Sequence, residues 1–200
     1  EEGYVEKQAE VISERGDIIP LHQALYGARA LAPIGNKITK MLEELGITLD
    51  ETFWCIASGS NLCGIGSKIK ERFNSKTFVV EPSENPTIDE LLDINDIKEV
   101  KRFAKKELSD YCVSKDKVYS GIAPLHGSHI NRYMLLNWKY TGKTGIDEVV
   151  RIPLTAVKET QRMLGEINPD YDWTRTTALP LVPAIQSAKE GRNVLIMSYG

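Results

Sequence analysis

The chain has 200 residues, of which 42% are hydrophobic and 26% are charged, and its formal net charge is −3. That is enough apolar material for one buried core, so we expect one domain or little more. The slightly acidic balance offers no basic field that would attract nucleic acid. The sequence contains no run of about 18 apolar residues that could cross a membrane. Neither nucleic-acid binding nor membrane insertion is therefore expected.

The three cysteines, Cys55, Cys63 and Cys112, are an odd number, and two of them lie in or beside apolar runs. This pattern favours reduced thiols in a cytoplasmic protein. The sequence has no C-x-x-C or H-x-x-x-H pair, so no metal site is expected. The chain begins at Glu1 without a methionine and ends just after an apolar stretch. We therefore expect it to be part of a longer protein that has a further N-terminal section.

The first part of the chain alternates between helical and strand patterns. Residues 1–20 predict a short helix and a connection. Apolar residues at helical spacing then predict a helix that begins near Ile34 and ends at Gly46. Two buried strands with a helix between them follow, at 52–57, 63–73 and 77–82. A strand–helix–strand unit of this kind implies parallel strands.

Residues 83–150 are a divergent, mostly polar segment that we place on the substrate side, with a Gly/Pro/Ser-rich loop at 120–129. Beyond it the sequence predicts, in order, a strand, two helices and a last strand, at 147–153, 155–167, 170–191 and 193–199. Thr155 is the expected N-cap of the first of these helices. The chain is thus predicted to be an α/β protein with a mostly parallel sheet and helices on both faces. Ligands of such sheets bind beyond the carboxyl ends of the strands, where three loops qualify: Ser58–Gly64, Ser120–Ser128 and Thr174–Ala178.

The first of these loops, Ser58-Gly59-Ser60-Asn61 with Cys63-Gly64, consists of small and polar residues between a strand and a helix. Small residues let backbone N–H groups approach a phosphate, and the helix N-terminus adds about half a positive charge. The loop lacks the lysine of a P-loop and a complete G-x-G-x-x-G. Glu81 stands only loosely where a ribose-binding acid would stand. A phosphate site and a tight glycine turn that serves helix–strand packing both remain open from spacing alone.

These residues resemble the phosphate loop of the fold-type II pyridoxal-phosphate enzymes, which include cysteine synthase, the tryptophan synthase β-subunit, threonine synthase and serine/threonine dehydratases. The stretch Ala57–Asn61, A-S-G-S-N, is similar to G-T-G-G-T of cysteine synthases and closer to G-G-G-S-N of tryptophan synthase β. Ala57 replaces the family's first glycine. Val80-Glu81-Pro82 matches a family strand that ends V-E-P. Residues 118–124 resemble the family's substrate loop, and residues 174–200 resemble its C-terminal segment.

The resemblance covers residues 1–200 as the later two-thirds of a tryptophan-synthase-β-like fold. It implies that pyridoxal 5'-phosphate is the cofactor and that an amino acid is the substrate of a β-elimination or β-replacement, a lyase or transferase reaction. The cofactor-binding residues that it implies are Ser58, Gly59, Ser60, Asn61, Gly64 and Thr176, with Thr176 at the pyridine nitrogen. The substrate-binding residues that it implies are Gly121, Ile122 and His126. Arg175 is a further candidate for contacting a substrate carboxylate.

The family's Schiff-base lysine lies in an N-terminal motif that this chain does not contain. The nearest candidates, Lys37, Lys68 and Lys70, lie on predicted helices whose patterns explain them as solvated residues. We therefore expect activity only together with an upstream, lysine-bearing segment, in a homodimer or by pairing with that segment. Two alternatives stay open. The chain could be a catalytically inactive binding or regulatory subunit on the same fold, or an α/β protein that binds another phosphate ligand.

Overall fold

The computed structural model describes residues 10–11, 13–15, 17, 23–84 and 145–198. In chain order the elements are α2 (Gln23–Glu44), β1 (Glu51–Trp54), the π-helical segment η1 (Leu62–Gly66), α3 (Ser67–Phe73), β2 (Lys76–Pro82), β3 (Glu148–Ile152), α7 (Leu154–Ile167), α8 (Arg175–Lys189) and β4 (Val194–Ile196). Most of the predicted divergent segment, including Gly121, Ile122 and His126, lies outside the described residues. The described part has no helix of the length and apolar character that a membrane crossing requires.

The described strands form one four-stranded sheet in the order β3-β2-β1-β4. Every neighbouring pair is parallel, with β1 between β2 and β4 and with Phe53 in register with Phe78 and Ile196. This confirms the parallel sheet that the alternation of elements predicts. Parallel strands put all their carboxyl ends at one edge of the sheet, which we call the carboxyl edge, and their starts at the opposite, amino edge.

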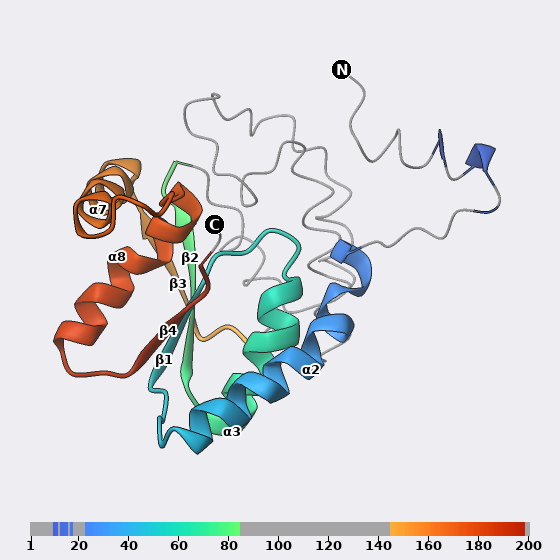
Figure 1. Ribbon diagram of the computed structural model, residues 1–200, viewed down its shortest axis with the longest axis horizontal. Coiled ribbons are helices and arrows are strands. Elements are labelled where there is room, and N and C mark those ends of the chain that lie inside the picture. Colours follow the sequence, from blue (N-terminus) through green and yellow to red (C-terminus); the bar gives the residue numbers. More distant parts are fainter. Residues whose placement is uncertain (1–9, 12, 16, 18–22, 85–144, 199–200) are drawn as a thin grey trace.

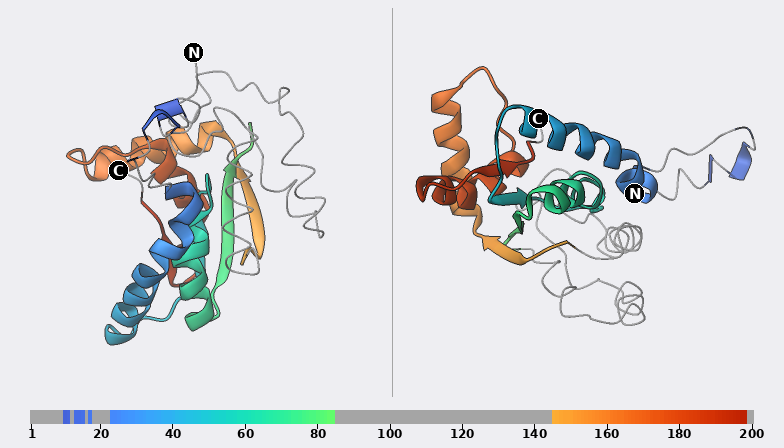
Figure 2. Two further views of the ribbon diagram at one scale, coloured as in Figure 1. Left: turned by 90° about the vertical axis from the view of Figure 1, so that its right-hand side faces the viewer. Right: turned by 90° about the horizontal axis from the view of Figure 1, so that it is seen from below.

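Helices cover both faces of this sheet, as Figures 1 and 2 show. Side chains of a strand alternate between faces, so neighbours in β1 enter different cores. Trp54 packs with Ile69 and Val79 under α2, η1 and α3. Phe53 packs with Val80 and Leu179 under α7 and α8 and stacks on Phe78 with ring centroids 4.8 Å apart. The predicted layering, with helices on both faces, is confirmed.

The prediction that the first long helix begins near Ile34 was wrong, because α2 begins at Gln23. Pro33, which suggests a helix start, lies inside α2, where its missing N–H removes one hydrogen bond of the helix. The packing of α2 on η1 and α3 holds the helix together on both sides of this gap. Gly46 follows the helix end with a positive φ of +67°, which fits the predicted C-terminal glycine.

Thr155 is not the N-cap of α7, contrary to the prediction. The helix begins one residue earlier, at Leu154, after an extended Pro153. The N–H of Leu154 donates instead to the Glu84 Oε1 atom at 2.8 Å, so a residue from the turn just after β2 caps this helix. A cap supplied by a residue so distant in the sequence has no local signature, and Thr155 stays exposed.

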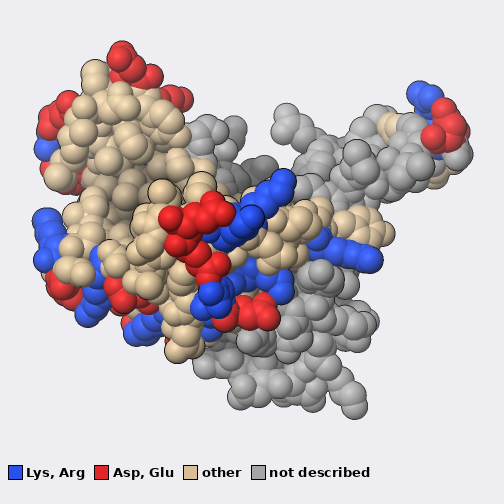
Figure 3. Space-filling view, turned by 60° about the horizontal axis from the view of Figure 1, so that its bottom comes forward, with Lys and Arg blue, Asp and Glu red and all other residues tan. Residues whose placement is uncertain are grey.

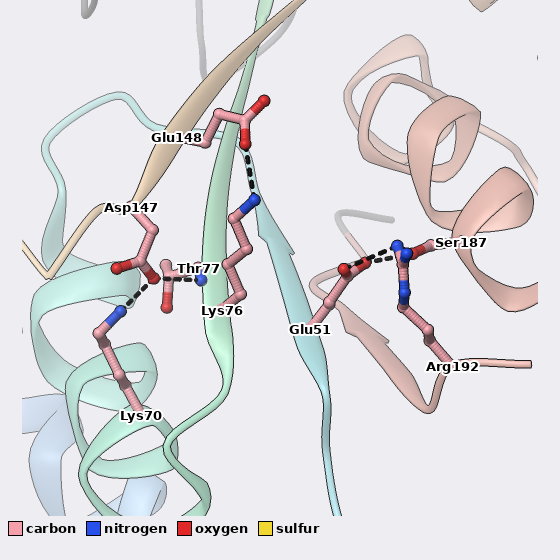
Figure 4. A network of polar contacts seen from close by, with 8 residues as sticks. All are labelled: Glu51, Lys70, Lys76, Thr77, Asp147, Glu148, Ser187 and Arg192. Atoms are coloured by element: carbon pink, nitrogen blue, oxygen red, sulfur yellow. Dashed lines mark hydrogen bonds and ion pairs between the residues drawn. The ribbon is translucent and has the colours of Figure 1, made fainter. Parts of the chain in front are cut away.

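Charged side chains close the amino edge of the sheet (Figure 4). The buried Glu51 carboxylate accepts from Arg192 Nη1 at 2.9 Å and from the Ser187 hydroxyl. Two further groups of contacts tie the starts of β2 and β3 together: Lys70 and the Thr77 N–H donate to Asp147, and Lys76 donates to Glu148 at 2.8 Å. These contacts join the starts of the strands to α3 and α8.

Candidate functional site

The loop that follows β1 lies at the carboxyl edge of the sheet, as does the start of α8. The C-terminal end of α8 meets the start of β1, because the Ser187 hydroxyl donates to the Glu51 carboxylate. The N-terminal end of α8 therefore points to the opposite edge. There the Cys55 thiol donates to the main-chain oxygen of Thr176 over 3.5 Å. The fold thus brings together two predicted site segments that are more than a hundred residues apart in the sequence.

The loop itself is compact and held by its own hydroxyl groups. Gly59 has a φ of +76°, which a glycine adopts without strain. The Ser58 and Ser60 hydroxyls are 2.9 Å apart and hydrogen-bonded, and the Ser60 N–H donates to Ser58 Oγ at 3.4 Å. The Cys63 N–H donates to the Gly59 carbonyl at 2.8 Å, which opens the helix that leads into η1. Ser58, Gly59, Ser60 and Asn61 therefore occupy one tight turn at a helix N-terminus.

This turn suits an anion. The amide N–H groups of a first helical turn point out of the helix end, where the helix dipole also favours negative charge. The stretch from Cys55 to Ser67 contains no acidic residue that would repel an anion. Ser58 and Asn61 are half-buried, whereas Gly59 and Ser60 are buried. The residues present fit a phosphate monoester by charge and hydrogen-bonding capacity.

The helix widens directly after the loop into the π-helical segment η1, whose five residues are all buried. Single π-turns of this kind are rare and occur often at functional sites. Gly64 lies in η1 with its Cα against α2, since a Cβ there would be 2.7 Å from the Ala28 carbonyl. Close helix packing thus accounts for a glycine at this position, and the phosphate-binding role of Gly64 stays a prediction. Cys63 is buried beneath the loop, as its apolar neighbours suggest.

Thr176 lies in the first turn of α8 and is only 2% exposed. The helix is capped by Thr174, whose hydroxyl accepts from the Thr177 N–H at 3.1 Å. Burial raises the pKa of the Cys55 thiol far above its ordinary range. Cys55 therefore stays protonated as a donor to the Thr176 carbonyl. The role of Thr176 at a ring nitrogen stays a prediction, but its backbone is fixed beside the loop.

Residues that precede α8 form a small aromatic cluster that the sequence did not reveal. Tyr171 and Trp173 have ring centroids 4.5 Å apart, and the Tyr171 hydroxyl is 3.1 Å from Ser198 Oγ, just beyond β4. Trp173 also donates to the Asn168 carbonyl at 3.1 Å. Arg175 follows this cluster and is half-buried. These contacts hold the segment that leads from Tyr171 to Thr176 against the end of β4. The role of Arg175 in contacting a substrate carboxylate stays a prediction.

Glu81, at the end of β2, is 1% exposed and accepts from Arg151 Nε at 3.2 Å. The two residues lie opposite each other in the β2–β3 pairing. This carboxylate thus joins two strands of the sheet. The Arg151 contact gives the V-E-P sequence a structural explanation that is independent of any ligand.

The three lysines considered from the sequence do not converge on the loop. Lys68 pairs with Glu71 on the same helix at 2.8 Å, and Lys37 is exposed on α2. Lys70 pairs with Asp147 at the amino edge of the sheet and is only 21% exposed, so it is less solvated than its helical pattern predicts. Within the described residues, these lysines are thus explained by surface pairing or exposure.

Comparisons with known proteins agree with this geometry at the level of the fold. No protein-family model matches the chain, and no curated protein matches it. Solved structures do. A hydrogen sulfide-producing enzyme from Fusobacterium nucleatum has a TM-score of 0.65 and 21% identity, with 96% of this chain and 49% of that chain covered.

Two further structures give the same result. An O-acetylserine-dependent cystathionine β-synthase from Helicobacter pylori has a TM-score of 0.64 and 18% identity, covering 98% of this chain and 55% of that one. O-acetylserine sulfhydrylase isoform 3 from Entamoeba histolytica has a TM-score of 0.64 and 14% identity, with coverages of 98% and 50%. The chain spans about half the length of these structures. The neighbours are fold-type II pyridoxal-phosphate enzymes, and this chain has their fold.

Proposed function

We propose that this chain is part of a pyridoxal-phosphate-dependent enzyme that acts on an amino acid by β-elimination or β-replacement, as a lyase or transferase. One observation carries the proposal. The Cys55–Thr176 contact brings the Ser58–Asn61 loop and the start of α8 together at the carboxyl edge of the sheet. Those are the two segments that would hold opposite ends of the cofactor, its phosphate and its ring nitrogen.

Each part of the site has a task in this proposal. The loop N–H groups and the Ser58 and Ser60 hydroxyls bind the phosphate, with Asn61 and Gly64 beside them. The Thr176 hydroxyl would serve as a neutral partner of the ring nitrogen, and a neutral partner would leave that nitrogen largely unprotonated. When bound, pyridoxal phosphate supplies the electron sink for a carbanion at the substrate α-carbon. Gly121, Ile122 and His126, which lie outside the described residues, border the substrate in this proposal.

The proposal requires a lysine from elsewhere, because the three candidates on the described helices are exposed or paired with carboxylates. We propose that an upstream segment supplies it, in a homodimer or by pairing of the two parts. We also propose that the protein acts in the cytoplasm. In support, Cys55 and Cys63 are buried and not joined in a disulfide, which suits a reducing compartment.

None of Lys37, Lys68 and Lys70 is identified as a Schiff-base lysine. This favours one alternative, a catalytically inactive binding or regulatory subunit on this fold. Such a subunit would still bind a phosphate-bearing ligand at the Ser58–Asn61 loop. It would neither react covalently with pyridoxal phosphate nor turn over an amino acid. Binding and turnover therefore have to be measured separately.

The test uses the protein as its gene encodes it and compares the binding of pyridoxal phosphate with that of pyridoxal, which lacks the phosphate. We expect Asn61→Asp to weaken pyridoxal-phosphate binding at least about tenfold, because it places a negative charge in the Ser58–Asn61 loop, the proposed anion loop. Asn74→Asp is the matched control. It makes the same chemical change at the far end of α3, where Asn74 is the exposed C-cap. Pyridoxal binding should respond little to either substitution.

Release of the β-substituent from O-acetylserine, the substrate that the Helicobacter pylori structure is named for, is the second measurement. Pyridoxal-phosphate binding with turnover supports the enzyme, and binding without turnover supports the inactive subunit. Equal affinities for pyridoxal phosphate and pyridoxal, or equal effects of Asn61→Asp and Asn74→Asp, would contradict both.

A further inference from the structure

Helix α2 approaches the Ser58–Asn61 loop, which we call the anion loop, very closely where Gly27 meets Ser60. A Cβ built on Gly27 would lie 2.5 Å from the Ser60 Cβ and would also collide with its hydroxyl. Real Cβ atoms do not approach other heavy atoms so closely. Only a residue without a side chain can therefore occupy position 27 while Ser60 stays where it is.

Ser60 has little freedom to move away from such a collision. Rotation about its Cα–Cβ bond would move the hydroxyl but leave the Cβ in place. Ser60 is 2% exposed as a residue, and its hydroxyl is hydrogen-bonded to Ser58 Oγ at 2.9 Å. Ser60 also begins the helix that continues into η1. A shift of Ser60 would therefore move the backbone of the loop and the Ser58 hydroxyl with it.

We propose that Gly27 is a positioning residue of the anion loop: its bare Cα sets where Ser60 lies and so sets the affinity of the site for a phosphate group. The affinity part of this inference rests on the proposed function, whereas the positioning part concerns the loop alone. Gly27 touches no ligand in this proposal. It acts through Ser60, from a helix that ends at the opposite side of the domain.

The same helix offers a control that separates positioning from packing. Gly35 also packs tightly on the segment after the loop, and a Cβ there would be 2.9 Å from the Lys68 Cβ and 3.0 Å from the Ile65 Cα. Alanine at either position therefore crowds the contact of α2 with η1 and α3. Only position 27 crowds a residue of the anion loop, whereas position 35 lies about two turns farther along α2.

The experiment measures pyridoxal-phosphate and pyridoxal binding for Gly27→Ala and Gly35→Ala, each with its unfolding free energy. Both substitutions should lower stability. We expect Gly27→Ala to weaken pyridoxal-phosphate binding at least about tenfold and Gly35→Ala less than about threefold. Pyridoxal binding should change little in either variant. Similar losses of phosphate-dependent affinity in both variants would overturn the inference.

Two double variants test the stated cause and remain informative if Gly27→Ala alone folds poorly. Ser60→Gly removes the Cβ that collides with position 27, whereas Ser60→Ala removes only the hydroxyl. Adding Gly27→Ala should therefore have little effect on pyridoxal-phosphate affinity in the Ser60→Gly protein and a large one in the Ser60→Ala protein. Equal effects in the two backgrounds would contradict the proposed contact.

A ligand-free measurement separates this inference from the proposed function. The amide chemical shifts of Gly59 and Ser60 should change in Gly27→Ala and stay nearly unchanged in Gly35→Ala. If this pattern is found but the wild-type protein binds no pyridoxal phosphate, the proposed function fails and the positioning role of Gly27 stands. If the wild-type protein binds the cofactor but the loop amides respond equally to both variants, the inference fails and the proposed function stands.

Discussion

At the amino edge of the sheet, charged side chains pair with one another, whereas the loop after β1 at the carboxyl edge is built from small, neutral residues. At the amino edge, Glu51, Asp147 and Glu148 form ion pairs with Arg192, Lys70 and Lys76, respectively. Figure 3 shows that side with acidic and basic side chains of the described residues interspersed. From Cys55 to Ser67, by contrast, the chain carries no charged residue at all.

This difference indicates that the two edges of the sheet have different tasks: the amino edge joins elements of the fold, and the carboxyl edge is suited to binding a ligand. A buried carboxylate is tolerated where a cation and further donors satisfy it, and there it joins elements together. A helix N-terminus lined by neutral donors keeps its electrostatic field for a ligand, because no side-chain carboxylate in the loop neutralises it. Substitutions at the amino edge should therefore change stability but not ligand binding, whereas substitutions at the carboxyl edge should change ligand binding, with or without a change in stability.

Arg192→Met should have the largest effect on stability. It leaves the Glu51 carboxylate, whose side chain is 8% exposed, without its cation. We expect the unfolding free energy to fall by about 2 kcal/mol, less than for a fully buried pair because Arg192 is itself half-exposed. Urea unfolding followed by tryptophan fluorescence measures this loss, and pyridoxal-phosphate affinity should stay unchanged.

Arg162→Met is the matched control for that substitution. Arg162 pairs with Glu159 and Glu166 on the exposed surface of α7. Exposed pairs contribute little, so the loss should be much smaller than that of Arg192→Met. An equal loss in the two variants would show that burial of Glu51 does not matter, and a loss of cofactor affinity in Arg192→Met would break the division between the edges.

Cys55 should make the carboxyl edge sensitive to alkaline pH. Burial raises the pKa of its thiol in the folded protein, whereas an unfolded thiol ionises near pH 8.5. The contribution of Cys55 is therefore fully present below about pH 8.5 and is lost as the pH rises further, by up to about 1.4 kcal/mol per pH unit.

Cys55→Ser keeps a donor for the Thr176 carbonyl but removes the ionisable group. Its unfolding free energy should fall less steeply between about pH 9 and pH 10 than that of the wild-type protein. Chemical denaturation at several pH values measures both slopes. If the slopes are the same, the thiol is not the titrating group that this argument requires.

Much of the fold could be predicted because it depends on local patterns. Mostly apolar runs such as those around Phe53–Trp54 and Thr77–Val80 predict buried central strands, and their alternation with helices implies parallel pairing, as the structure has it. The ends of elements were less predictable. The predicted strand 52–57 stops at Trp54, because the chain leaves the sheet there to form the anion loop. The cap of α7 came from Glu84, which no local pattern near Thr155 could indicate.

The candidate site likewise has features that could be predicted from the sequence and features that could not. Residue types and topology predicted the Ser58–Asn61 loop as one of two open interpretations, and the family resemblance added Thr176. The fold brings their segments together. The contact between Gly27 and Ser60 depends on how closely α2 approaches the loop, which no local pattern specifies. A glycine inside a helix is the one signal that could have pointed to it, since glycine in a helix interior is unfavourable without a packing reason.

Thr174→Ala should lower stability by about 1 kcal/mol, because it removes the hydroxyl that accepts from the Thr177 N–H at the start of α8. Thr155→Ala is the matched control, since Thr155 is exposed and does not cap α7. Thermal unfolding of the two variants gives the comparison. Because Thr174 is close to Thr176, its loss should also weaken pyridoxal-phosphate binding. Equal stabilities of the two variants would show that the cap contributes nothing.

The smallest expected effect is an acid sensitivity at the amino edge. Partial burial works to raise the pKa of Asp147, but hydrogen bonds from Lys70 and the Thr77 N–H outweigh it. The net result is a pKa below the usual range, helped by the charges of Lys70 and Lys76. The folded pKa is depressed, so the contribution of Asp147 is present above the unfolded value, about 3.9, and is lost as the pH falls through the folded one.

Asp147→Asn should therefore destabilise the protein near neutral pH and progressively less as the pH falls below about 4. The effect is small because the Asp147 side chain is 37% exposed, so water and salt screen the pair. Urea unfolding from pH 6 to pH 3, with and without added salt, measures it. A stability difference that is independent of both pH and salt would mean that the Asp147 contacts act as neutral hydrogen bonds. The Asp147 part of the amino edge would then be held by geometry rather than by charge, and the contrast with the carboxyl edge would have to rest on the Glu51–Arg192 and Lys76–Glu148 pairs.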